Sequence, residues 1–482
     1  THKGLLLLLC CSCSVGSRAL SREHVDTYPI ALQSLHRPGV THKMPSEKYH
    51  VAIVGGGITG AMAASALIQN SEKVHVTLFD QGRSVGGRSS HRRIDPESKN
   101  QLKPEEEPAK GVHNFDHGCQ FFRADDETFR AEVEKWVASG WASKWDGRFG
   151  VLPGDGTGDT TTPTDFFGLQ KSAANVYVGV KGINSVVRGL LGAAAESGRC
   201  DLFPGVRVAS MQRTDDGTWQ MIGPEPGSTG TFHDTSEKAA AAAQYDLLVD
   251  GRKFNAVLVT DISASFESWH RASASVPEAL SAQVRHRVRI PLFTALVVFA
   301  PPGLPPPIDL DGATIQGDSC LWFAARTASK NGLSASENTA PGEAWTLVST
   351  PAYAAAEIER VPMRDPETGA FIPQDPSYLS QGPSSTLLAA FEAACRRYHA
   401  AAHEKKEEEE NPGKKTEEKE KTDLVWPAVA YLGGQRWGSA LPAPTHVGGR
   451  DGLGRSTSSS KEICGTWYET SANPPLFDAG KG

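Results

Sequence analysis

Long apolar runs and an excess of positive charge are both missing from this 482-residue sequence. No stretch reaches the roughly eighteen consecutive apolar residues that a membrane-spanning helix needs, so no transmembrane segment is expected. The formal net charge is −7, which argues against a nucleic-acid partner. With 39% hydrophobic and 22% charged residues, the composition is that of a globular chain with a large core, and the length favours two domains.

The eight cysteines follow no pattern that predicts a disulfide framework or a zinc site. Cys10 and Cys13 form a C-x-x-C pair, but they precede every expected folded element, so we assign them no redox role. The sequence also has no His-Glu-x-x-His motif, no paired metal ligands and no Ser/His/Asp order. It therefore identifies no metal ligand and no catalytic acid or base.

The first 44 residues are expected to lie outside the folded domains. A short apolar run at 5–15 is followed by small and basic residues, which is typical of a secretory or organelle-targeting leader. Alternatively, the segment is an upstream extension, and a soluble intracellular protein begins at Met44. No N-x-Ser/Thr sequon occurs, which weakens the secreted alternative.

The strongest pattern is a strand that ends in a glycine-rich turn. Tyr49–Val54 is a compact apolar run of strand length, and a G-x-G-x-x-G sequence follows it directly. The first glycine permits a tight turn, the second lets the backbone approach a pyrophosphate, and the third lets the next helix pack closely on the strand. The N-terminus of that helix offers free N–H groups to phosphates. The candidate phosphate-binding residues are Gly55, Gly57, Thr59 and Gly60.

The residues after this turn complete a dinucleotide-binding unit. Small residues from Ile58 to Gln69 predict a helix, and the apolar run at 74–79 predicts a second strand. That strand ends in Asp80, about twenty residues beyond the last glycine, where a carboxylate can accept hydrogen bonds from a ribose. This order of strand, glycines, helix, strand and acid predicts an α/β, Rossmann-like domain.

The rest of the sequence predicts further strands and helices. Acids at its start and Gly140 at its end mark a helix at 125–140, and Asp216-Gly217 marks a hairpin. Apolar residues at helical spacing predict another helix around 387–398, and the Glu/Lys-rich run behind it is expected to be a solvated insertion. The expected strands are 115–122, 177–182, 206–212, 219–222, 256–260, 294–299, 321–325, 345–349 and 461–467.

A second glycine-rich sequence follows Asp80, and with it the chain resembles a specific known family. It reads Gln-Gly-Arg-Ser-Val-Gly-Gly-Arg at 81–88. An acid, Gly-Arg and Gly-Gly-Arg in this order after a dinucleotide fold resemble the FAD-dependent amine oxidase superfamily. The resemblance implies FAD as the cofactor, with the Gly-Gly-Arg loop beside its diphosphate and flavin. It adds Asp80, Arg83, Gly86, Gly87 and Arg88 as cofactor-binding residues.

Within that superfamily the chain most resembles the renalase-like branch. The sequence FDHGCQFF at 115–122 resembles the branch's strand with Gly-x-Gln near the isoalloxazine, which makes Gln120 a candidate flavin neighbour. Val208 stands where a strand of that branch touches adenine. The segments 322–330 and 435–442 resemble its substrate side, and their candidate cations are Arg326, Lys330 and Arg436.

The resemblance implies a Rossmann-like FAD-binding domain interleaved with a β-sheet-rich α+β substrate domain. The FAD-binding domain would comprise 45–125, 176–262 and 460–482, and the substrate domain 126–175 and 263–459, with a charged insertion at 403–423. Near its C-terminus the family has Gly-Asp close to the flavin. Here Gly465 matches the glycine, but Thr466 follows it, and the family's closing helix is not visible.

The function implied is that of an FAD-dependent oxidase. It would take a hydride from a small-molecule substrate, a dihydronicotinamide isomer or an amine, and pass electrons to molecular oxygen. A single G-x-G-x-x-G argues against a second, nicotinamide-binding domain. Two alternatives are open: a flavoenzyme of the desaturase or protoporphyrinogen-oxidase type, and a degenerate dinucleotide fold without catalysis, which Thr466 favours.

Overall fold

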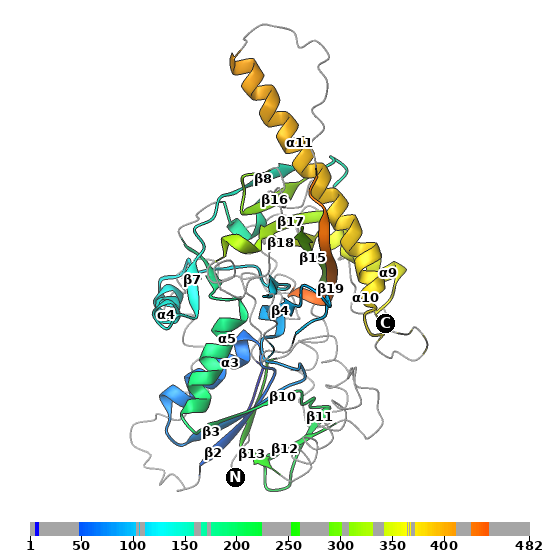
Figure 1. Ribbon diagram of the computed structural model, residues 1–482. Coiled ribbons are helices and arrows are strands. Elements are labelled where there is room, and N and C mark those ends of the chain that lie inside the picture. The colour runs from blue at the N-terminus through cyan, green and yellow to red at the C-terminus, as the bar shows by residue number, and fades with distance from the viewer. Residues whose placement is uncertain are drawn as a thin grey trace, which may run out of the picture.

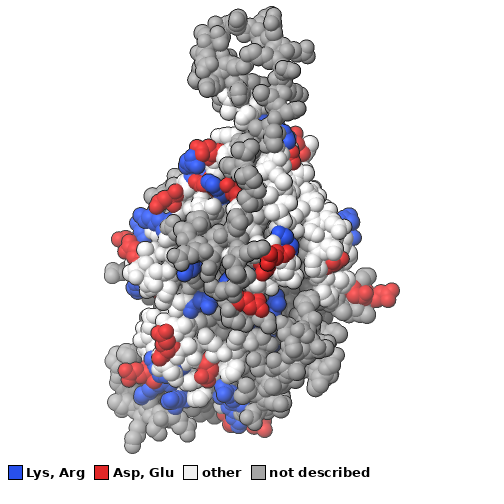
Figure 2. Space-filling model, in the orientation of Figure 1, with Lys and Arg blue, Asp and Glu red and all other residues white. Residues whose placement is uncertain are grey.

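Two sheets organise the protein, a parallel one in the lower half of Figure 1 and a larger mixed one in the upper half. Throughout the described ranges, every helix is too short or too polar to span a bilayer. On the described surface of the face in Figure 2, acidic and basic side chains are interspersed rather than gathered by sign. The computed structural model describes residues 5–8, 48–102, 106, 111–158, 165–170, 175–223, 252–260, 289–300, 308–330, 342–363, 365, 367, 372–410 and 426–442.

The lower sheet is parallel throughout, with the strand order β1-β14-β2-β3-β10. The connection from β2 to β3 passes through α3, so the expected βαβ unit is present. Both faces of a parallel sheet are covered, which explains the continuous apolar sequence of its strands. Its elements are β1 (Leu5–Leu8), β2 (Tyr49–Val54), α3 (Ile58–Asn70), β3 (Val74–Asp80), α5 (Asn184–Glu196), β10 (Cys200–Pro204) and β14 (Ala256–Val259).

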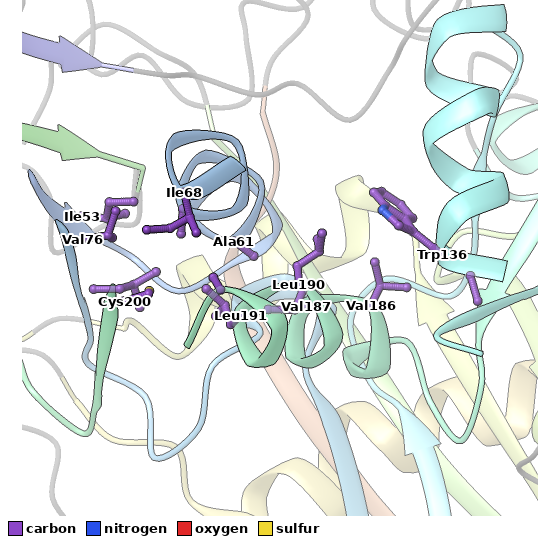
Figure 3. Packing of buried hydrophobic residues seen from close by; sticks show 14 of the residues in the cluster. Ile53, Ala61, Ile68, Val76, Trp136, Val186, Val187, Leu190, Leu191 and Cys200 are labelled. Carbon is purple, nitrogen blue, oxygen red and sulfur yellow. The ribbon is translucent and has the colours of Figure 1, made fainter. Parts of the chain in front are cut away.

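Helices α3 and α5 cover one face of this sheet (Figure 3). Ala61 and Ala64 are fully buried, and their small side chains let α3 pack close to its neighbours. Ile53, Val76 and Leu190 fill the layer between sheet and helices. Each large aliphatic side chain buried in this way stabilises the fold by about 1.5–3 kcal/mol.

A small antiparallel sheet covers the opposite face of the parallel sheet. Its strands are β11 (Ser210–Arg213), β12 (Trp219–Ile222) and β13 (Lys253–Phe254). Trp219 and Phe254 pack there against Phe79 of β3, with the rings of Phe79 and Phe254 edge to face at 6.1 Å. The parallel sheet is thus held between two apolar layers.

The upper sheet has the strand order β19-β15-β18-β17-β16-β8, antiparallel except for the β16–β8 pair. Phe293, Ala295 and Val297 of β15 pack toward α9 and α11, whereas the intervening Leu296 and Val298 pack on Ile94 and Phe115. Figure 1 shows the C-terminal end of α11 extending away from the body. The elements are β8 (Phe149–Pro153), β15 (Arg289–Phe299), β16 (Gly312–Gln316), β17 (Leu321–Arg326), β18 (Glu343–Ser349), α9 (Pro351–Arg360), α10 (Pro376–Leu379), η5 (Ser380–Ser384), α11 (Ser385–Glu410) and β19 (Val429–Pro442).

Short elements join the two halves. The antiparallel hairpin of β4 (His91–Ile94) and β5 (His113–Asp116) lies between the sheets, where Phe115 packs on Leu296 and Val298 of β15. A separate three-stranded sheet has the order β6-β9-β7. The remaining elements are η1 (Gly87–Ser89), β6 (Phe122–Arg123), α4 (Glu127–Ala138), β7 (Ala142–Lys144), η2 (Phe166–Gly168), β9 (Val176–Gly179) and η4 (Thr327–Ser329).

The Rossmann-like α/β fold expected from the sequence is confirmed, and the bounds of several elements differ. The single strand expected at 115–122 is two strands, because the backbone turns at 117–121 to pass close to Arg88. The strand expected at 206–212 begins only at Ser210. Helix α11 continues to Glu410, inside the expected insertion, since Glu and Lys are good helix formers. The strand expected at 461–467 lies outside the described residues.

Gly60 offers a test of the packing in the first βαβ unit. A Cβ at Gly60 would lie 2.0 Å from the carbonyl oxygen of Gly55, so Gly60→Ala is expected to lower the free energy of unfolding by about 3 kcal/mol. Gly192 in α5 is the matched control, because a Cβ there meets no atom within 4 Å. Gly192→Ala should raise stability by about 0.5–1 kcal/mol in urea unfolding. Equal effects of the two substitutions would contradict this account.

Candidate dinucleotide site and domain junction

The glycine-rich turn leaves open space in front of α3. Gly57 is the N-cap of α3, and among the described residues a Cβ on it would meet only the Gly86 carbonyl oxygen, at 3.9 Å. Within the described part of the chain, no side chain caps this helix and no acid lies in its first turn. Thr59 lies in that first turn. The amide groups and positive dipole end of α3 are therefore suited to an external anion.

Asp80 braces the turn from the end of β3. Its carboxylate accepts hydrogen bonds from the backbone N–H groups of Gly56 and Gly82, both at 2.6 Å. The side chain is buried and closes the turn, which is a structural role, and its expected contact with a ribose stays a prediction.

The Gly-Gly-Arg loop packs directly on the glycine-rich turn. Gly86 donates its N–H to the Gly56 carbonyl at 2.9 Å and forms a parallel bridge with Gly57. Gly86 and Gly87 have φ values of 140° and 53°, which other residues rarely adopt. The two glycine-rich segments, separate in sequence, thus form one continuous backbone surface.

Asn184 is a site residue that the sequence did not indicate. It is the first residue of α5, and its Nδ2 donates to the Val85 carbonyl at 3.1 Å. Its buried Oδ1 has no hydrogen-bond partner among the described residues and lies beside Gly86. Asn184 therefore anchors the Gly-Gly-Arg loop from another part of the chain. No local motif marks an asparagine with this role.

The segment after β5 joins this loop to the upper sheet. A Cβ on Gly118 would lie 2.2 Å from the Arg88 carbonyl oxygen and 3.2 Å from the Trp437 indole. Cys119 also donates its N–H to that carbonyl at 2.8 Å. Only glycine therefore fits at position 118. The turn at Gly118 packs against the Arg88 backbone and against the Trp437 side chain.

Gln120 is buried, and its amide is turned inward. Nε2 donates to the carbonyl oxygens of Asp116 and Gly118, and Oε1 accepts from Lys330 Nζ at 3.2 Å. The side chain therefore orders the turn at 116–120. Its expected contact with a flavin stays a prediction.

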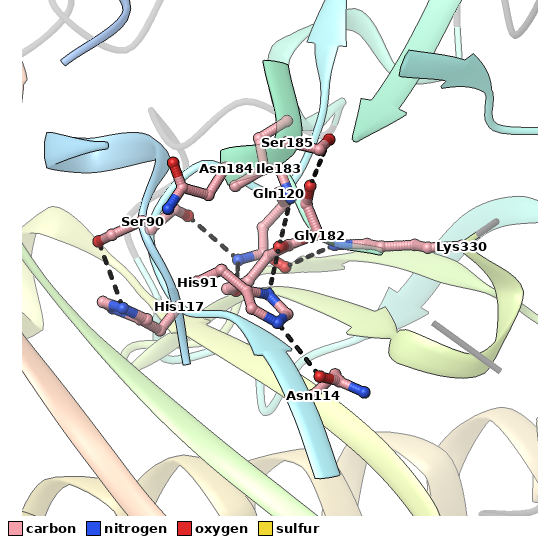
Figure 4. Close-up of polar contacts among 12 residues, drawn as sticks. Ser90, His91, Asn114, His117, Gln120, Gly182, Ile183, Asn184, Ser185 and Lys330 are labelled. Atoms are coloured by element: carbon pink, nitrogen blue, oxygen red, sulfur yellow. Dashed lines mark hydrogen bonds and ion pairs between the residues drawn. The ribbon is translucent and has the colours of Figure 1, made fainter. Parts of the chain in front are cut away.

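Asp116 is the centre of a buried polar group, and its partners His91, Ile183 and Lys330 are labelled in Figure 4. Its carboxylate accepts from the Ile183 N–H at 2.8 Å, lies 3.3 Å from His91 Nδ1 and forms an ion pair with Lys330 at 3.2 Å. Burial by itself raises the pKa of Asp116, but the Lys330 ammonium, His91 and the Ile183 N–H together lower the pKa to about 2. Asp116 is therefore ionised at neutral pH.

The β4–β5 hairpin has two polar faces. His91 pairs with Asp116 across the ladder, and both side chains face α5 and Lys330. By strand alternation, Ser90, Arg92 and His117 lie on the opposite face, toward β15 and β19. His117 stacks on Trp437 with ring centroids 5.4 Å apart.

The other predicted residues are dispersed. Val208 is buried in the apolar layer beside Phe79. Arg326 pairs with Asp311 and Glu343. Arg436 points to the α10 side of β19, where it donates to the Ile372 carbonyl at 2.9 Å, so it does not share the face of Trp437. Arg83 is exposed in the loop after β3, and Gly465 lies outside the described residues.

The residues fit the diphosphate of FAD at one end. The open space at Gly57, the uncapped α3 N-terminus and the absence of an acid there, among the described residues, are what a diphosphate requires. Gly86 and Gly87 extend this surface toward the domain junction.

Lys330 tests the buried ion pair. Lys330→Met leaves the Asp116 charge without its cation and should lower the free energy of unfolding by about 3–5 kcal/mol. The double variant with Asp116→Asn removes both charges and should be more stable than Lys330→Met alone. Arg396→Met, which breaks an exposed pair with Glu392, is the control and should cost under about 1 kcal/mol in urea unfolding. A single variant as stable as this control would contradict the assignment.

The buried histidines predict how stability depends on pH. Burial, and then Lys99, lower the pKa of His113 to about 4. Because the unfolded value is about 6.5, the unfolded chain binds a proton that the folded chain excludes between these values. Stability should therefore fall as the pH falls from about 6.5 to about 4. His113→Gln should reduce this pH-dependent loss of stability, measured as the urea midpoint at each pH. An unchanged dependence of the midpoint on pH would contradict the role of His113.

Comparison with known proteins agrees with the lower half of the fold. Residues 53–135 match the NAD(P)-binding Rossmann-like domain family. The chain is similar to a proposed protoporphyrinogen oxidase from Exiguobacterium sp. 255-15, with 11% identity, a TM-score of 0.48, and 82% of this chain and 88% of that chain covered. It is also similar to a reduced UDP-galactopyranose mutase, with 10% identity, a TM-score of 0.43, and 81% of this chain and 82% of that chain covered. A further similar structure is a redesigned putrescine oxidase, with 12% identity, a TM-score of 0.39, and 65% of this chain and 77% of that chain covered. At these values the fold assignment rests on the strand order and the matched domain: the chain contains a Rossmann-like dinucleotide-binding domain.

Proposed function

We propose that this protein is an FAD-dependent oxidoreductase of the renalase-like type. It takes a hydride from a small reduced substrate, a dihydronicotinamide isomer or an amine, and passes the electrons to molecular oxygen. The observation that carries the proposal is the parallel bridge between Gly57 and Gly86. It joins the phosphate-binding turn to the Gly-Gly-Arg loop, and Gly118 links that loop to the substrate-side strand β19.

The residues divide the binding of FAD among them. The α3 N-terminus and Gly57 hold the diphosphate, and Arg88 adds a positive charge beside it. Asp80 keeps the turn closed and accepts from the ribose. Val208, beside β3, contributes apolar contact to the adenosine end. Gly465 completes the flavin end, as the family resemblance implies.

The chemistry needs few reacting side chains. When bound, the isoalloxazine of FAD accepts the hydride itself, so the protein's task is to position the substrate and exclude water. Lys330 and Asp116 hold Gln120 in one orientation and so keep the turn at 116–120 against Arg88. Gly118 then keeps Trp437 at a fixed distance from the loop.

The purified full-length chain tests the proposal. It should bind FAD and absorb at about 450 nm, and the bound flavin should be bleached by a dihydronicotinamide or an amine under anaerobic conditions and recover with oxygen. Porphyrinogen and polyene substrates address the alternative flavoenzyme. A colourless protein that FAD does not reconstitute would favour the scaffold alternative and end the proposal.

Gly57→Ala is the sharpest variant. Gly57 has φ −76°, which any residue adopts, so the added methyl fits the fold and only fills the space in front of α3. FAD affinity should fall about tenfold or more, equivalent to about 1.4 kcal/mol, with the urea midpoint unchanged. Gly192→Ala is the control and should keep wild-type affinity. Undiminished FAD binding by Gly57→Ala would show that the diphosphate binds elsewhere.

A further inference from the structure

Three residues at the junction of the two sheets form a second polar group, which we call the Arg92 cluster: Arg92, His117 and Trp437. Arg92 and His117 come from one face of the β4–β5 hairpin, and Trp437 comes from β19. They lie on the opposite face of the hairpin from the Asp116–Lys330 pair. Nothing in the proposed binding of FAD uses them.

Arg92 is a half-buried cation whose hydrogen bonds within the described residues go only to neutral oxygens. One terminal nitrogen donates to the Gly434 carbonyl at 3.2 Å and the other to Gln435 Oε1 at 2.5 Å. Its Nε is buried without a partner, and no carboxylate of the described residues lies within ion-pair distance. Burial lowers the pKa of Arg92, Tyr431 raises it, and the charge of Arg83 lowers it further. Among the described residues the guanidinium thus has no carboxylate to compensate its desolvation, and its Nε has no acceptor.

His117 offers a second unused group beside this cation. Its Nε2 lies 3.3 Å from Ser90 Oγ, whereas its buried Nδ1 has no partner among the described residues. The backbone is fixed, because the His117 carbonyl accepts from Trp437 Nε1 at 2.8 Å and from Thr294 Oγ1 at 3.0 Å. Burial, Arg92 and His91 lower the pKa of His117 well below its usual value, against a smaller opposite effect of Asp116. The ring is therefore neutral and keeps one nitrogen for a ligand.

We propose that the Arg92 cluster binds the anionic group of the substrate, a carboxylate or a phosphate. This inference rests on the proposed function and specifies its substrate class. A guanidinium donates in the fork geometry that both oxyanions accept. An oxyanion would select the tautomer in which Ser90 donates to Nε2 and Nδ1–H donates to the ligand. Trp437, half-buried beside Gly118, provides an apolar wall for the organic part of the substrate.

The position of the cluster favours the substrate over the cofactor as the source of the anion. Both oxygens that Arg92 contacts, and the indole on which His117 stacks, belong to β19 of the upper sheet. The diphosphate end of the proposed FAD site lies instead on the lower sheet, at Gly57 and the start of α3. A substrate anion at β19 would lie across the Gly118 turn from Arg88.

Calorimetric titration of the full-length protein tests the inference. Benzoate and phenyl phosphate are the two oxyanion probes, benzamide is the uncharged control, and each is titrated into FAD-loaded and FAD-free protein. At least one oxyanion should bind the FAD-loaded protein and benzamide should not. Whichever oxyanion binds more tightly identifies the source of the anion as a carboxylate or a phosphate.

The variants isolate the guanidinium. Arg92→Gln should weaken oxyanion binding about 10- to 100-fold, as expected for loss of charge-assisted hydrogen bonds, and Arg92→Lys should recover part of it. His117→Phe keeps an aromatic ring but removes Nδ1 and should weaken binding severalfold. Arg436→Gln, on the other face of β19, is the matched control and should bind as the wild type does.

Three outcomes would overturn the inference: no oxyanion binding to FAD-loaded wild type, equal affinity in Arg92→Gln, or oxyanion binding that FAD abolishes. The last outcome would assign the Arg92 charge to the cofactor. FAD content is read separately from its absorbance. A protein that binds FAD but no oxyanion leaves the proposed function intact, and one that binds oxyanions but no FAD contradicts the function alone.

Discussion

The Asp116 carboxylate is the interaction on which the arrangement of the two halves depends. It connects β4 through His91, the start of α5 through the Ile183 N–H, and the end of η4 through Lys330. An isolated buried charge is costly, so these partners must all be in place for Asp116 to be stable in its ionised form. One buried carboxylate therefore connects the helix layer of the lower sheet, the hairpin and the segment that follows β17 of the upper sheet.

Close backbone approaches then convert this arrangement into a site. Gly60 packs on Gly55, Gly86 on Gly57, and Gly118 on Arg88, and each approach leaves no room for a Cβ or places the backbone at a positive φ. The three contacts run from α3 to strand β19 of the upper sheet. A shift of the backbone at one of these contacts would displace the backbone at the next contact. The glycine-rich turn and the upper sheet are therefore structurally coupled.

The local part of this structure is predictable from sequence, and the non-local part is not. Strand β2, helix α3, strand β3 and Asp80 follow in order along the chain, so apolar periodicity and the glycines identify them. No local motif marks Asn184 or Asp116, because their partners lie between 25 and 214 residues away along the chain. Gln120 is expected from the sequence on a single strand at 115–122, whereas it lies on the turn between β5 and β6, and its inward amide depends on Lys330, 210 residues later. Strand β8 is equally hard to predict from local sequence, since β16, the strand with which it pairs, is distant along the chain.

The two faces of the β4–β5 hairpin show how burial can distinguish a structural charge from a functional one. On one face, Lys330 and Asp116 neutralise each other, so that face is complete without a ligand. On the other, Arg92 has neutral acceptors only, and the nearby Arg83 acts on it with the same sign of charge. A folded chain tolerates such an uncompensated cation most readily where an anion arrives from outside. The same hairpin therefore connects the two sheets with one face and, in the proposed binding of a substrate anion, presents Arg92 with the other.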